Sequence, residues 1–60
     1  MKKHEIKTRL EDVKLRNVTL TEARIKYYEL AKDDTKVLDR KIELAVIQDL
    51  FTEIEMALGL

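Results

Sequence analysis

The sequence contains no cysteine and no proline, and its single glycine, Gly59, stands near the end. The absence of cysteine excludes disulfide bonds and thiolate metal sites. Without proline or an internal glycine, no residue forces a helix to break before position 59. A glycine-rich phosphate-binding loop, which needs several glycines, is excluded as well. These absences favour long, uninterrupted helices.

Side chains for catalysis are also scarce. There is no serine or cysteine, and the one histidine, His4, lies close to the N-terminus, so no nucleophile has an obvious base beside it. Asp39 with Glu43, and Asp49 with Glu53, have a spacing at which two carboxylates on one helix face could share a cation. Helical di-metal sites also need Glu-x-x-His motifs, which the sequence lacks. We expect no catalytic residues, no metal, no cofactor and no small-molecule substrate.

Long apolar runs are missing. The longest covers residues 44–47, which is far short of a membrane span. The first residues are basic but are not followed by the apolar stretch of a signal peptide. We therefore expect a cytoplasmic protein with no membrane partner.

The charged residues are distributed unevenly along a chain whose net charge is zero. Residues 1–32 contain nine Lys/Arg and five Asp/Glu, a balance of +4, whereas residues 33–60 contain three and seven, a balance of −4. Opposite charges of this kind attract each other within a hairpin or across a dimer, and a basic half can alternatively face nucleic acid.

The C-terminal half predicts an amphipathic helix over residues 35–58, with Asp34 as its N-cap. A seam with heptad spacing runs along it and comprises Val37, Leu44, Ile47, Phe51, Ile54 and Leu58. Arg40 occupies the one seam position that is not apolar. Val46, Leu50 and Ala57 widen the apolar arc to about half the helix circumference. An arc this wide predicts contact with two neighbours, and Gly59 is suited to ending the helix in the left-handed conformation.

The N-terminal half allows two interpretations. The Thr19–Glu22 spacing is that of a capping box and favours separate helices over residues 3–16 and 20–32, whereas the lack of glycine and proline favours one continuous helix. We predict at most a kink or short turn at 17–19, and a polar connector at 32–35. The predicted apolar face of residues 20–32 comprises Leu20, Ala23, Tyr27, Leu30 and Ala31. A continuous helix would place Asn17 in one long seam, where it could fix register and oligomer state; the other members of that seam are Ile6, Leu10, Val13, Leu20 and Tyr27.

Together these patterns predict an all-α, single-domain chain over residues 1–60. It would be a helical hairpin of two main helices, with a possible third from a break near 17–19, assembling as a homodimeric bundle of coiled-coil type. A 60-residue chain buries only about 60% of its unfolded surface, so oligomerisation is expected to stabilise it. The expected function is a non-enzymatic, self-associating interaction module that regulates or inhibits a partner protein by binding. The predicted interface comprises Leu44, Ile47, Leu50, Phe51, Ile54 and Leu58.

A second interpretation begins at residues 13–16, where apolar and basic side chains alternate as in a strand. A helix to Lys32, a short turn and a helix from about 35 follow. This order resembles the ribbon-helix-helix family of dimeric DNA-binding repressors. The resemblance implies a strand that pairs across the dimer and enters the major groove, with Lys14 and Arg16 contacting DNA. The alternative function is therefore that of a transcriptional regulator.

Overall fold

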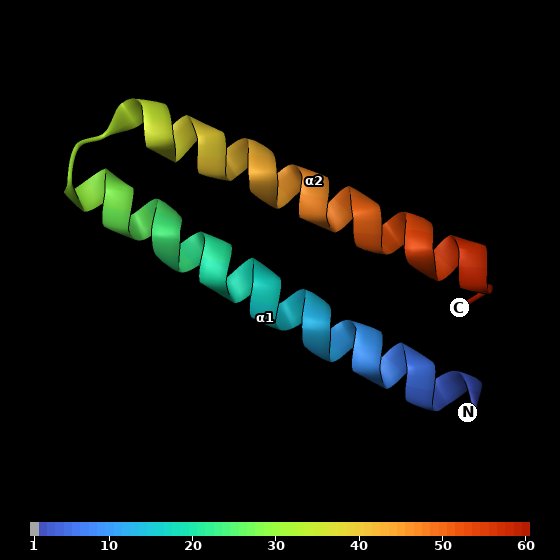
Figure 1. The fold of residues 1–60 in the computed structure, drawn as a ribbon. Coiled ribbons are helices and arrows are strands. Elements are labelled where there is room, and N and C mark those ends of the chain that lie inside the picture. Colours follow the sequence, from blue (N-terminus) through green and yellow to red (C-terminus); the bar gives the residue numbers. More distant parts are fainter. Residues whose placement is uncertain (1) are drawn as a thin grey trace.

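The computed structural model describes residues 2–60 and contains two helices, α1 (Lys3–Leu30) and α2 (Asp34–Leu58). They lie side by side and antiparallel, so that both termini are at the end opposite the turn (Figure 1). No strand occurs between residues 2 and 60. The all-α hairpin predicted from the sequence is confirmed.

Helix α1 is continuous through residues 17–19, so the possible third helix does not form. The Asn17 side-chain amide donates to the Val13 carbonyl at 2.8 Å, and the Thr21 hydroxyl donates to the Asn17 carbonyl at 2.9 Å. Such bonds to the preceding turn satisfy polar side chains inside a helix. The capping-box spacing at Thr19 therefore produces no break.

The turn combines a helix end with the next helix start. The Asp33 N–H donates to the Tyr28 carbonyl at 3.0 Å and the Lys32 N–H to the Glu29 carbonyl at 3.1 Å, which is the pattern of a Schellman motif. Asp33 then caps α2, because its carboxylate accepts from the Lys36 N–H at 3.2 Å. The prediction of Asp34 as N-cap is wrong by one residue. Asp33 is the residue with non-helical backbone angles (φ −98°, ψ 81°), as an N-cap requires.

Lys32 adopts a left-handed backbone conformation, with φ of 57°, at a position where glycine is usual. This conformation costs a residue with a side chain roughly 1–2 kcal/mol. Glycine also gains entropy in the unfolded chain, which offsets part of this benefit, so we expect Lys32→Gly to raise the free energy of unfolding by about 0.5–1 kcal/mol. The melting temperature should rise by several degrees in thermal circular dichroism. As a control, Lys26→Gly in the middle of α1 should lower it; a Lys32→Gly chain that melts no higher than the parent would contradict the argument.

The contact between the helices has a small buried core. Phe51 from α2 and Ile25 from α1 are each 8% exposed, and Thr21 is 2% exposed. The seam predicted for α2 is confirmed apart from its last residue, Leu58, which is half exposed. The half-buried residues that flank the core are Ile6, Leu10, Lys14, Val18, Tyr28, Val37, Arg40, Leu44, Ile47 and Ile54. Two buried apolar side chains are few, even for a chain of this size.

The apolar face predicted for residues 20–32 does not pack against α2. Its members Leu20, Ala23, Tyr27, Leu30 and Ala31 are all exposed. Helix α2 instead covers the neighbouring face of α1, which carries Val18, Thr21, Ile25 and Tyr28. Because α1 has two apolar faces, a single partner helix leaves one of them uncovered. The covered face includes Thr21, whose hydroxyl is already bonded within its own helix and adds no unsatisfied polar group to the contact.

The C-terminus of α2 ends as the sequence predicted. Gly59 is left-handed, with φ of 70° and ψ of 32°. Its N–H donates to the Met56 carbonyl at 3.1 Å, and the Leu60 N–H donates to the Glu55 carbonyl at 2.8 Å. This second Schellman motif brings Leu60 next to the start of α1, where it lines a shallow hollow with Lys3 and Lys7.

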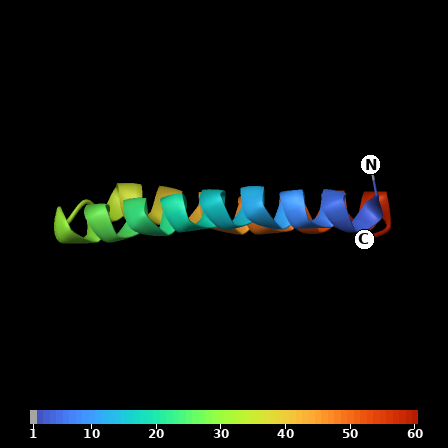
Figure 2. The ribbon, with the colours of Figure 1, turned by 90° about the horizontal axis from the view of Figure 1, so that it is seen from below.

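The hairpin measures 45 × 16 × 9 Å and is a single layer of two helices (Figure 2). Its radius of gyration is 14.1 Å, against about 10 Å for a compact domain of this length. Domains normally bury their apolar faces between two packed layers. Each broad face of this hairpin is therefore open.

Candidate functional site: the apolar face of the hairpin

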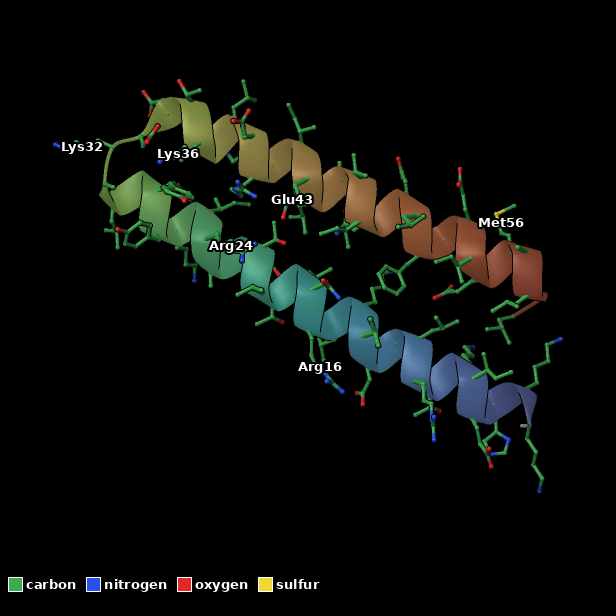
Figure 3. All side chains as sticks on the ribbon, viewed as in Figure 1. Arg16, Arg24, Lys32, Lys36, Glu43 and Met56 are labelled. Atoms are coloured by element: carbon green, nitrogen blue, oxygen red, sulfur yellow. The ribbon has the colours of Figure 1, made fainter. Side chains whose placement is uncertain are left out.

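The Arg24–Glu43 ion pair identifies one of the two broad faces. Its Arg24 Nη1 lies 3.9 Å from Glu43 Oε1, across the gap between the helices; Figure 3 shows the two side chains pointing toward each other. Leu20 lies one turn from Arg24 and Val46 one turn from Glu43, so they share this side of the molecule. We define the apolar face as Val13, Leu20, Tyr27, Val46 and Leu50, all of which are exposed.

The apolar face extends along both helices. Val13, Leu20 and Tyr27 are spaced by seven residues, an interval over which a straight helix drifts only about 20°. They therefore form a nearly straight line along α1. Val46 and Leu50 are one turn apart on α2. Since Arg24 lies opposite Glu43, Leu20 is level with Val46 to within about one residue, or roughly 1.5 Å.

The opposite broad face carries charged side chains around two shallow hollows. One hollow on it is lined by Glu22, Lys26, Glu29 and Lys41, together with the edges of Ile25 and Leu44. A second hollow is lined by Lys7, Glu11, Lys14, Leu15, Val18, Gln48 and Glu55. Basic residues of α1 and an acidic residue of α2 thus share a hollow, as the opposite charges of the two halves predicted. These hollows with charged linings lie on one broad face, and the five exposed residues of the apolar face lie on the other.

Beside the apolar face, one carboxylate is shared by two guanidinium groups. Arg40 Nη1 donates to Glu43 Oε2, while Arg24 approaches the other carboxylate oxygen. Arg40 comes from the polar position of the α2 seam, and its Nε is buried without a hydrogen-bond partner among the described residues. Two guanidinium groups and one carboxylate give this cluster a net charge of +1.

The apolar face has a basic edge and an acidic edge. Arg9 and Arg16 each lie one turn before an apolar-face residue of α1 and form its basic edge. Figure 3 shows Arg16 pointing away from α2; its ion pair with Asp12, at 3.7 Å, is highly exposed and contributes little stability. On α2, Asp39 and Glu53 lie seven residues before and after Val46. Neither acid takes part in an ion pair within residues 2–60.

The six interface residues predicted from the sequence all lie on α2 but in different surroundings. Phe51 is buried against α1, and Leu44, Ile47 and Ile54 are half-buried in the seam. Leu50 and Leu58 remain about half exposed, and of the six only Leu50 belongs to the apolar face. The seam predicted for a continuous α1 includes Val13, Leu20 and Tyr27, all of which are exposed, whereas its members Ile6 and Leu10 are half-buried. The seven-residue spacing of Val13, Leu20 and Tyr27 was visible, but it does not reveal which of two apolar faces the second helix covers.

Lys14 and Arg16 do not form a common surface. Residues 13–16 lie inside α1, where the ribbon-helix-helix resemblance implied a strand. Two residues apart on a helix, the side chains diverge by about 200°. Lys14 is half-buried beside the contact with α2, whereas Arg16 is exposed. The strand that was expected to carry both into the major groove is therefore absent from this part of the chain.

Within residues 2–60, no group of three or more His, Asp and Glu side chains is arranged to hold a metal ion. Neither of the two helices has a stretch that is both long and apolar enough to cross a bilayer. A scan against protein-family models, a search of curated proteins and a search of solved structures found no match. The apolar face, with its charged edges, is therefore the feature from which a function can be argued.

Proposed function

We propose that this chain is a non-enzymatic helical interaction module, which self-associates as a homodimer through its apolar face and regulates or inhibits a partner protein by binding it. The single-layer shape, with an apolar residue set on one broad face, carries the proposal. A second hairpin on that face makes a four-helix bundle, in which the exposed residues become core.

The accessible surface supports a partner of this size. The hairpin exposes 4870 Å², whereas a compact 7.1 kDa protein is expected to expose about 4,100 Å². The excess is close to the roughly 800 Å² that each partner buries in a standard interface. One further copy therefore covers about the area by which the hairpin departs from a compact domain.

Charge favours a second copy as the occupant of the apolar face. The net charge is zero, so two copies approach without long-range repulsion. The basic edge carries Arg9 and Arg16, and the acidic edge carries Asp39 and Glu53. A face with edges of opposite sign is complementary to itself, as the shared patch of a two-fold dimer must be.

Binding of another protein would use the outer surfaces, which the dimer leaves open. Leu38 and Ile42 lie one turn apart on the side of α2 away from α1, and both are exposed. Met56 points away from α1 on the same helix (Figure 3) and is also exposed. Apolar side chains of this kind, methionine in particular, are enriched in protein–protein contacts. They support the regulatory part of the proposal.

The proposal predicts the mass of the protein in solution. Sedimentation equilibrium or light scattering at low micromolar concentration should give twice 7.1 kDa. The melting temperature should rise with protein concentration, since association stabilises the folded state by mass action. A stable, folded monomer in this range would refute self-association. Salt-sensitive binding to duplex DNA that weakens with Lys14→Ala and Arg16→Ala would instead support the alternative of a DNA-binding regulator.

A further inference from the structure

We propose that in the dimer the two turns lie at the same end, so that each α1 packs against the α2 of the partner; this inference rests on the self-association proposed above. Two hairpins stacked face to face have two possible two-fold axes. An axis parallel to the helices places α1 on the partner's α2 and both turns together. An axis across the helices places α1 on the partner's α1 and the turns at opposite ends.

The charged edges favour the same-end arrangement. It places the Arg9 and Arg16 edge over the partner's acidic edge, which carries Asp39 and Glu53. The opposite-end arrangement brings arginine edge onto arginine edge and acid onto acid. Like charges placed opposite one another disfavour an arrangement. The two arrangements bury the same apolar residues, so the charges decide between them.

The apolar residues also match in the same-end arrangement. An axis parallel to the helices keeps every residue at its own height along the bundle. Leu20 is level with Val46 in its own chain and is therefore level with Val46 of the second copy. Across the dimer these two side chains face each other with an offset of about one residue along the axis. In the opposite-end arrangement, Leu20 would instead meet Val13 of the second copy.

The excess positive charge beside the apolar face gains a partner in the same-end arrangement. Arg24 and Arg40 share the single carboxylate of Glu43. Asp39 lies four residues before Glu43 on α2, which places it about one turn beyond Arg24, at the height of Tyr28 on α1. In the second copy it would lie above that part of α1. The two symmetry-related contacts, at the same height on opposite sides of the axis, would each place an acid within about one turn of a cluster.

Engineered cysteines test the arrangement without background, because the natural chain has none. Chains with Leu20→Cys are mixed with chains that carry Val46→Cys, and one of the two is lengthened by a tag. The mixture is oxidised at a concentration at which sedimentation or light scattering shows the mass of a dimer. Facing positions on packed helices meet the distance needed for a disulfide. The same-end arrangement predicts a mixed disulfide between position 20 of one chain and position 46 of the other. On a non-reducing gel, the tag separates this product from the two symmetric dimers.

The matched mixture of Leu20→Cys with Val13→Cys should give little mixed product. A strong product from this pair would overturn the same-end arrangement and establish the opposite one. A dimer that gives neither product would overturn it as well, while leaving self-association intact. A sample that is monomeric by mass would instead overturn the proposed function, so the two failures are distinguishable.

Charge reversal gives an independent test with opposite signs for the two arrangements. Glu53→Lys should weaken the same-end dimer roughly tenfold in Kd, because the new lysine faces the partner's arginine edge. In the opposite-end dimer the same change would relieve acid–acid repulsion and tighten association. Asp49→Lys is the control, since it makes the same charge change one turn away on the outer side of α2. Equal effects of the two variants, or a tighter Glu53→Lys dimer, would overturn the proposal.

Discussion

Phe51→Asp is expected to unfold the hairpin. Phe51 is one of two apolar side chains buried between α1 and α2, and truncation of a buried phenylalanine alone costs about 3–5 kcal/mol. Aspartate adds the cost of removing a carboxylate from water at a position where the side chain is only 8% exposed. A domain of this size rarely has more than about 5 kcal/mol of stability to lose. The helical signal in far-ultraviolet circular dichroism at 25 °C should fall to that of an unfolded chain.

Met56→Asp is the matched control for Phe51→Asp. It makes the same kind of change on the same helix, five residues along, at a side chain that is 74% exposed. Its melting curve should lie within about 0.5 kcal/mol of the parent, as surface substitutions usually do. If Phe51→Asp melts like Met56→Asp, the buried contact described for Phe51 is wrong.

Leu20→Glu is expected to raise the Kd of the proposed dimer at least about 100-fold, because it places a carboxylate against an apolar partner surface in both copies. The change does not weaken α1 itself, because a glutamate at position 20 forms a favourable i,i+4 pair with Arg24. Sedimentation velocity over a dilution series gives the dissociation constant, and circular dichroism follows any loss of helix as the subunits separate.

Leu38→Glu separates an effect on the apolar face from a general effect of adding a charge. Leu38 and Leu20 are similarly exposed, at 59% and 51%, but Leu38 lies on the side of α2 away from α1. The Leu38→Glu dimer should keep the mass and the dissociation constant of the parent. A Leu20→Glu chain that stays dimeric would remove the apolar face from the interface.

Much of the fold follows from local rules that the sequence displays. The heptad seam of α2, the glycine that ends it and the polar turn are each determined by residues within one or two turns of one another. The cap moved from Asp34 to Asp33 because two adjacent aspartates satisfy the same rule, and the left-handed conformation of Lys32 determines which one has the required backbone angles. Continuity of α1 depended on how Asn17 and Thr21 satisfy their polar groups, which spacing alone does not indicate.

The candidate site was harder to predict, because it depends on which of two apolar faces of α1 is covered. A rule that buries the larger apolar residues selects Leu20 and Tyr27. The structure instead buries Thr21 and Ile25. The local sequence of α1 does not indicate which face is covered, because that depends on how the whole of α2 packs against α1. The sequence did indicate from the width of the α2 arc that one neighbour would be insufficient, and the exposed Val46 and Leu50 agree with that expectation.

The small buried core has a consequence for how long the protein persists. Because only Ile25 and Phe51 are buried among its described apolar residues, a lone hairpin is expected to open readily. Proteases act on the open form in proportion to its population, and the proposed dimer suppresses that population as concentration rises. At concentrations below the dissociation constant, the chains would then be degraded quickly. At concentrations above it, dimerisation would protect them from proteolysis. The amount of protein would therefore rise steeply once the rate of synthesis brings its concentration above the dissociation constant, and would not rise in simple proportion to that rate.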